Sequence, residues 1–133
     1  MSVKHLYLVA VVAVLGCASS AAGKSAAPRS NILTAEEIAA HHADINTAYD
    51  AIARLRPNWL VPHGITSGVD NGAGTEYALV FVDGQRYGDI NTLRGIPAYH
   101  VGNVRYYNVT EAGARFGIHG GSSGAIEVTL LAP

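Results

Sequence analysis

The spacing of apolar and polar residues predicts two short helices between residues 34 and 56. Thr34 and Glu37 have the spacing of a capping box, in which Thr34 accepts from the amide of Glu37 and the Glu37 side chain reaches back. A helix should begin there. A second helix should follow Asp44, a candidate N-cap, and end before Pro57, because apolar residues recur at helical spacing between them. These residues are Ile45, Ala48, Tyr49, Ile52 and Leu55.

Three further segments have the patterns of β-strands. The continuous apolar run Tyr77–Val82 predicts a strand that is buried on both faces, and the Asp83-Gly84 dipeptide after it is typical of a tight turn. Val104–Val109 is a second predicted strand. Ala125–Leu131 alternates apolar and polar residues, which predicts a strand with one buried face. Together these elements predict an α+β fold, a small mixed β-sheet with two or three short helices packed on it.

The N-terminal segment has the layout of a secretory signal. Its apolar run, Leu6–Leu15, follows a lysine and is shorter than the roughly 20 residues that span a membrane as a helix. The sole cysteine, Cys17, comes directly after Val14-Leu15-Gly16, and this order resembles the lipobox of bacterial lipoproteins. We therefore expect residues 1–16 to be a signal peptide and Cys17 to be lipidated. The alternative is a plain signal cleaved after Ala22, which would remove Cys17 as well.

The composition of the rest of the chain indicates a tether and one domain, and argues against one class of partner. Residues 17–30 are mostly small and polar, as expected for a flexible tether that joins the lipid anchor to one domain at residues 31–133. Removal of residues 1–16 takes away one of the nine lysines and arginines, which leaves eight against ten acidic residues. This acidic balance argues against nucleic-acid binding, which needs a basic surface.

The glycine-rich segment Gly113–Val128 contains His119 and two serines and suggests catalysis. A phosphate-binding loop would need a lysine, but none follows Lys24. Gly120–Gly124 lacks the spacing of a dinucleotide-binding loop, and no GxSxG motif supplies a nucleophile. We interpret the glycines as the tight backbone approach to the last strand, and we expect no enzymatic activity and no cofactor.

Histidines and aromatic residues offer two other kinds of site. Five histidines follow Cys17, and metal binding is a hypothesis for them: His41, His42, His63, His100 and His119. Because His41 and His42 are adjacent, they would point to different faces of a helix, so we interpret the histidines as surface or loop residues and expect no metal site. Several aromatic residues could line a sugar-binding face or fill a small core: Trp59, Tyr87, Tyr99, Tyr106 and Tyr107.

Taken in order, five segments resemble the plug domain of TonB-dependent outer-membrane receptors. They are Asn31–Ile38 (NILTAEEI), Ala51–Leu60 (AIARLRPNWL), Ala78–Gly84 (ALVFVDG), Leu93–Tyr107 (LRGIPAYHVGNVRYY) and Ala114–Leu130 (ARFGIHGGSSGAIEVTL). The plug-like structural motif includes Val82, Asp83, Gly84, Gly117 and Gly124. In that family the plug is a small mixed α/β domain that sits inside a β-barrel and gates uptake, so the resemblance implies a plug-like fold. The loops that contact ligand in those receptors match least, so no ligand-binding residue is assigned.

The resemblance also suggests a function. The matched pattern ends close to Pro133, where the barrel strands of the family would begin, so we expect a stand-alone plug-like domain. Ala18 after the lipidated cysteine favours the outer membrane, by resemblance to lipoprotein sorting. The expected protein is a non-enzymatic outer-membrane lipoprotein that faces the periplasm and binds a protein or envelope partner, such as a separate β-barrel, in a transport-related assembly. The alternative is a soluble periplasmic module that binds a glycan or small ligand.

Overall fold

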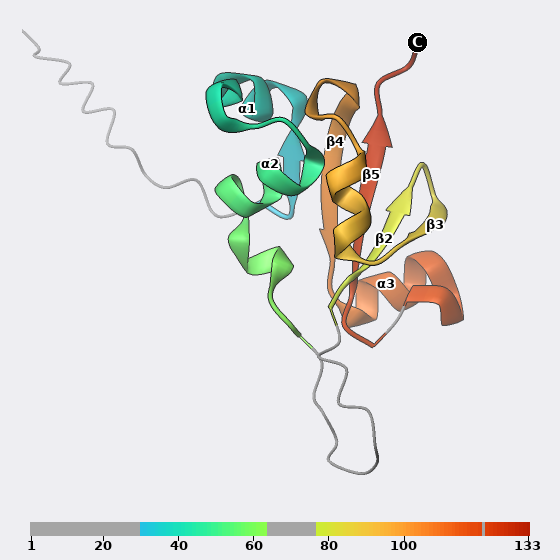
Figure 1. Cartoon of the computed structure of the whole chain (residues 1–133). Helices are drawn as coiled ribbons and strands as arrows, with labels where there is room; N and C mark the ends of the chain where they lie inside the picture. Colours follow the sequence, from blue (N-terminus) through green and yellow to red (C-terminus); the bar gives the residue numbers. More distant parts are fainter. Residues whose placement is uncertain (1–29, 64–76, 121) are drawn as a thin grey trace, which may run out of the picture.

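The computed structural model describes residues 30–63, 77–120 and 122–133 (Figure 1). In this part of the chain, five strands form one mixed sheet with helices on both faces, in the order β1-β4-β5-β2-β3. The strands are β1 (Ile32–Thr34), β2 (Leu79–Val82), β3 (Gln85–Gly88), β4 (Val101–Tyr107) and β5 (Ala125–Leu130). The α-helices are α1 (Ala35–Ala40), α2 (Ala48–Leu55) and α3 (Val109–Phe116). The predicted α+β fold class is confirmed.

The central strand, β5, is parallel to β2, and the other neighbouring strands pair antiparallel. β2 lies between β5 and β3, and its Val80 and Phe81 are buried on opposite faces, as the unbroken apolar run predicted. The prediction for the last strand was wrong in one respect. Residues 125–128 of β5 are buried on both faces, because α3 packs over the face that alternation had assigned to solvent.

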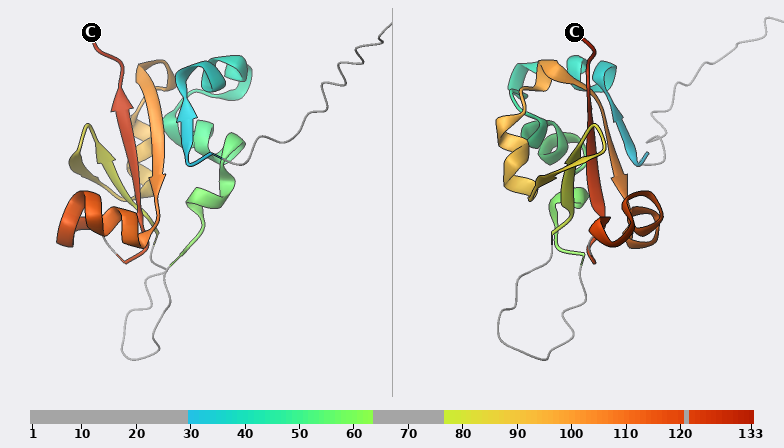
Figure 2. Two further views of the ribbon diagram at one scale, coloured as in Figure 1. Left: turned by 180° about the vertical axis from the view of Figure 1, so that it is seen from behind. Right: turned by 90° about the vertical axis from the view of Figure 1, so that its right-hand side faces the viewer.

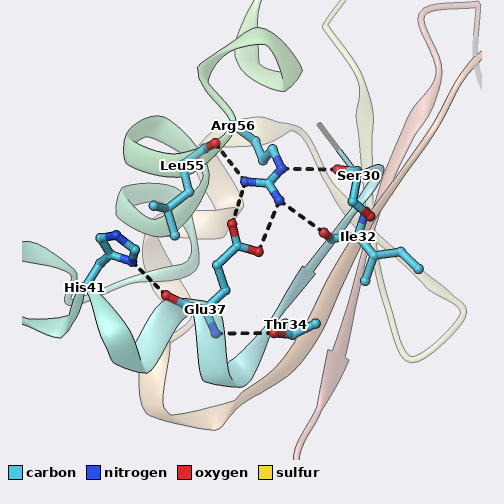
Figure 3. Close-up of polar contacts among 7 residues, drawn as sticks. All are labelled: Ser30, Ile32, Thr34, Glu37, His41, Leu55 and Arg56. Atoms are coloured by element: carbon cyan, nitrogen blue, oxygen red, sulfur yellow. Dashed lines mark hydrogen bonds and ion pairs between the residues drawn. The ribbon is translucent and has the colours of Figure 1, made fainter. Parts of the chain in front are cut away.

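Helix α1 begins where the sequence predicts, but only half of its capping box forms. The Thr34 hydroxyl accepts from the amide of Glu37 at 3.2 Å. The Glu37 carboxylate instead accepts two hydrogen bonds from the Arg56 guanidinium, at 2.7 and 3.1 Å (Figure 3). The same guanidinium donates to the carbonyls of Ser30 and Ile32 beside the edge strand β1. A residue at the end of α2 thus ties β1 to α1.

Helix α2 begins later than predicted. Asp44 lies in a short 3-10 turn, His42–Asp44, and is not its N-cap. The cap is Thr47, whose hydroxyl accepts from the Asp50 amide while the Asp50 carboxylate accepts from the Thr47 amide. This reciprocal pair satisfies two free amides, which a single aspartate at position 44 could not do. The end of the helix before Pro57 is as predicted.

Helix α3 was not predicted. The strand predicted at Val104–Val109 ends at Tyr107, and Asn108 is the N-cap of α3. Asn108 and Glu111 form a complete capping box, and the predicted strand, which continued to Val109, ran across it. Gly117 ends the helix with a positive φ of 62°.

The helices cover the two faces of the sheet unequally (Figures 1 and 2). α1 and α2 pack with a larger apolar cluster on one face, around Leu33, Ile52 and Val104. α3 lies across one end of the other face and covers a smaller cluster that includes Phe81 and Tyr107. In the left panel of Figure 2, β4 and β5 lie at the front, and no helix crosses them beyond α3. Part of this second face is therefore open.

Candidate functional site

The plug-like motif residues lie at two separate ends of the β2–β5 pair. Val82 ends β2, and Asp83 and Gly84 form the turn into β3 with φ values of 48° and 81°. The Asp83 carboxylate accepts from the amide of Leu130 at 3.0 Å, which ties this turn to the end of β5. This half of the motif therefore holds backbone together and leaves no group poised for chemistry.

Gly117 and Gly124 lie at the other end, beside α3. Gly124 has φ +86°, and a Cβ added there would lie 2.5 Å from the carbonyl oxygen of Tyr107. At Gly120 an added Cβ would lie 2.5 Å from the carbonyl of Ala112. Gly120 and Gly124 thus allow the chain to pass close to α3 and β4 before it enters β5, whereas a Cβ at Gly117 would meet no atom within 4 Å. The expected lipid anchor, Cys17, and the expected tether lie outside the described residues.

Three of the five candidate histidines contact nearby backbone, and the His100 ring lies edge-on to that of Tyr99. Nδ1 of His41 lies 2.9 Å from the carbonyl of Glu37, and Nδ1 of His42 lies 2.8 Å from that of Ala39. Nε2 of His63 lies 2.8 Å from the carbonyl of Asn58. Over residues 30–63, 77–120 and 122–133, no three His, Cys, Asp or Glu side chains are grouped so that they could hold a metal ion.

The predicted aromatic residues separate into core and surface. Trp59 is buried and stacks on Tyr106, with ring centroids 5.8 Å apart, and Tyr107 is buried under α3. Tyr87 on β3 and Tyr99 in a 3-10 turn are exposed. A cavity of about 300 Å³ is lined by other aromatic and polar residues: Tyr49, Leu60, Tyr77, Asp89, Ile90 and Asn91.

Glu127 is the one acidic side chain that is buried in the described part of the chain, with 6% of its surface exposed. The Tyr107 hydroxyl donates to its Oε2 at 2.8 Å, and Nη2 of Arg115 on α3 donates to its Oε1 at 3.1 Å. Alternation along β5 had placed Glu127 on the solvent side. Its burial depends on α3. Because the sequence did not predict α3, it predicted neither the burial of Glu127 nor its ion pair with Arg115.

The electrostatics of this cluster follow from burial and pairing. Burial, reinforced by the hydrogen bond to Glu127, raises the pKa of the Tyr107 phenol above its ordinary value of 10.0. The hydrogen bond to Glu127 also raises the pKa of Arg115. Arg105 lies opposite Glu127 across the β4–β5 pair, with its guanidinium 4.8 Å from the centre of the Tyr107 ring. The cluster therefore holds a neutral tyrosine, a paired carboxylate and two fixed cations, which suits recognition of negative charge better than bond making.

The Tyr107–Glu127 bond should appear in the pH dependence of stability. We expect Tyr107→Phe to lower the free energy of unfolding by about 1.5 kcal/mol at neutral pH, the usual loss for a hydrogen bond to a charged group. Above about pH 10 the tyrosine releases its proton in the unfolded state, whereas the folded Tyr107 retains it. The free energy of unfolding of the wild type therefore falls with pH, while that of the variant, which has no phenol at this position, is not lowered by this effect. The gap between the two proteins should narrow in urea unfolding at about pH 11. Tyr87→Phe, at an exposed position, is the control, and a gap that widens with pH would contradict the assignment.

The chain gives no match in comparisons with protein-family models, with curated proteins or with solved structures. None of the helices in the described ranges is long and apolar enough to cross a membrane.

Proposed function

We propose that this chain is an outer-membrane lipoprotein whose plug-like domain binds a protein partner in the bacterial envelope and catalyses no reaction. One observation carries the proposal: the segments that resemble plug domains fall in a single sheet-and-helix unit. The first contains β1 and α1, and the third contains β2 and its turn. The fourth contains β4, and the last runs from the end of α3 through β5.

The chemistry of the described surface supports binding over catalysis. The buried carboxylate of Glu127 is occupied by Tyr107 and Arg115, and the plug-like glycine Gly124 packs against the backbone of β4. The exposed Arg86 and Arg105 lie on a sheet face that α3 covers only at one end. A partner in the envelope would reach this face if Cys17 anchors the chain to the membrane and residues 18–30 act as the tether.

Lipid anchoring is tested with the full-length chain expressed in a Gram-negative host. We expect the wild type to sediment with the outer membrane and its mature N-terminus to begin at Cys17 with the mass of attached acyl chains. Cys17→Ala should lose the acyl mass and the outer-membrane sedimentation, because Cys17 is the sole cysteine. Cross-linking of wild-type envelopes should then give a discrete protein adduct. A mature chain that begins near Gly23 without acyl mass would refute the anchor, and envelopes without any adduct would refute the partner.

A further inference from the structure

The open part of the sheet face on the α3 side gathers three arginines. Arg105 on β4 pairs with Glu127 on β5, Glu127 pairs with Phe81 on β2, and Phe81 pairs with Arg86 on β3. Because paired residues project on the same side of a sheet, these side chains form one row across it. Arg115 reaches the same row from α3 through Glu127. We call this surface, made by Arg86, Arg105, Arg115 and the exposed Thr129, the arginine face.

The arginine face has an excess of positive charge. Glu127 is its central carboxylate, and Arg115 already pairs with it. Within the described ranges, Arg86 and Arg105 have no carboxylate within ion-pair distance. On the α1–α2 side, by contrast, Arg54 pairs with Asp44 and Arg56 pairs with Glu37. Two of the three described arginines without a carboxylate partner thus lie on the arginine face, in a chain whose acidic residues outnumber its basic ones. The third, Arg94, stacks on the Tyr49 ring of α2, on the other side of the sheet.

Two of these arginines are held in place before any partner arrives. The Tyr107 ring lies under the Arg105 guanidinium at 4.8 Å, and the Glu127 carboxylate holds Arg115 at 3.1 Å. Arg105 and Arg86 are three strand positions apart, a distance of roughly 14 Å at the usual spacing between strands. A planar guanidinium binds a carboxylate through two parallel hydrogen bonds, and a fixed guanidinium loses less freedom when it does so. Two carboxylates a few residues apart on one segment could span this distance.

We propose that the arginine face binds an acidic segment of the partner protein. This inference rests on the proposed function, because it names the surface and the partner chemistry of that same binding role. The cations of the open face complement a carboxylate-rich segment, whereas the opposite face is covered by α1 and α2.

The first test measures binding of a fluorescein-labelled glutamate-rich peptide by anisotropy at about 50 mM salt, where exposed charges are weakly screened. We expect Arg105→Glu to weaken binding at least about tenfold, since it removes an attraction and adds a repulsion. Arg54→Glu makes the same change in net charge on the exposed side of α2 and should change the affinity less than about twofold. Arg86→Glu provides a second variant on the arginine face, and thermal unfolding by circular dichroism checks that each variant is folded.

Three outcomes would overturn the proposal. Equal losses in Arg105→Glu and Arg54→Glu would show that only net charge matters. A wild type that does not bind the peptide would remove the acidic-segment assignment. Binding to phosphatidylglycerol vesicles in place of the peptide, lost in Arg105→Glu, would make the face a lipid contact.

A second test separates this inference from the proposed function. A photo-cross-linking amino acid is placed in the full-length chain at Thr129, on the arginine face, or at Ala39, on the exposed side of α1. Adducts from position 129 that disappear with Arg105→Glu would support the inference. Adducts from position 39 alone would leave the proposed function standing and overturn the arginine face as the docking surface. Absence of adducts from both positions would count against the envelope partner itself.

Discussion

Replacing Gly124 with alanine is expected to lower the free energy of unfolding by about 3 to 5 kcal/mol, enough to unfold a marginal domain of this size. The residue has φ +86°, where a side chain costs about 1 to 2 kcal/mol. The added Cβ would also lie 2.5 Å from the carbonyl oxygen of Tyr107, and this neighbour is backbone of β4 that cannot rotate away. Relief of the contact requires β5 to shift from β4, which disturbs the central strand pairing. Urea unfolding followed by circular dichroism measures the change.

Gly113→Ala is the matched control for this prediction. Gly113 lies inside α3 and is exposed, and no heavy atom lies within 4 Å of a Cβ built there. Alanine should therefore raise the free energy of unfolding by about 0.5 to 1 kcal/mol, the usual gain in a helix. Similar destabilisation by both substitutions would show that glycine in this segment is needed for a reason other than the contact at Gly124.

The parts of the fold that the sequence predicts are those set by local pattern. An unbroken apolar run can be satisfied only by burial on both sides, so Tyr77–Val82 identified the strand beside the centre of the sheet. The Asp83-Gly84 turn follows from the backbone freedom of its residues, since both adopt positive φ. The start of α1 follows from the Thr34 hydroxyl. For the turn and the helix cap, the decisive residues lie fewer than five positions apart.

The errors have a different origin. Asp44 and Thr47 are both acceptable N-caps, and only the reciprocal bond from Asp50 decides between them. The apolar residues before Asn108 resemble a strand that continues, although its capping box with Glu111 starts a helix. In both cases a capping box between residues three positions apart decides where the helix begins.

The arginine face could not be predicted from local sequence patterns. The row from Arg105 through Glu127 to Arg86 exists because β4, β5, β2 and β3 are neighbours in the sheet, although they are distant in sequence. Alternation indicated correctly that Glu127 shares a face with Ala125, but it could not indicate that α3 covers that face. A buried carboxylate needs a partner, and α3 supplies one in Arg115.

Replacing Arg56 with methionine is the second change with a large expected effect, a loss of about 2 to 3 kcal/mol in the free energy of unfolding. The Arg56 side chain is 11% exposed and that of Glu37 is 34% exposed, so the substitution would leave a partly buried carboxylate without its cation. It would also remove the donors to the carbonyls of Ser30 and Ile32 beside β1 (Figure 3). β1 is a three-residue edge strand with one neighbour, β4, and depends on such contacts more than the central strands do.

Arg54→Met is the control for this change, because its ion pair with Asp44 has both side chains more than 60% exposed and should contribute less than about 0.5 kcal/mol. Arg56→Lys keeps the charge but cannot make the forked contact with Glu37, so its loss of unfolding free energy should fall between those of Arg54→Met and Arg56→Met.

Hydrogen exchange shows which part of the sheet Arg56→Met destabilises. The Tyr106 amide donates to the carbonyl of Asn31 just before β1, and its protection should fall in Arg56→Met before that of the Leu79 amide, which donates to Gly124 at the centre of the sheet. Uniform loss of protection at both amides would mean that Arg56 stabilises the whole domain and has no particular role in holding β1.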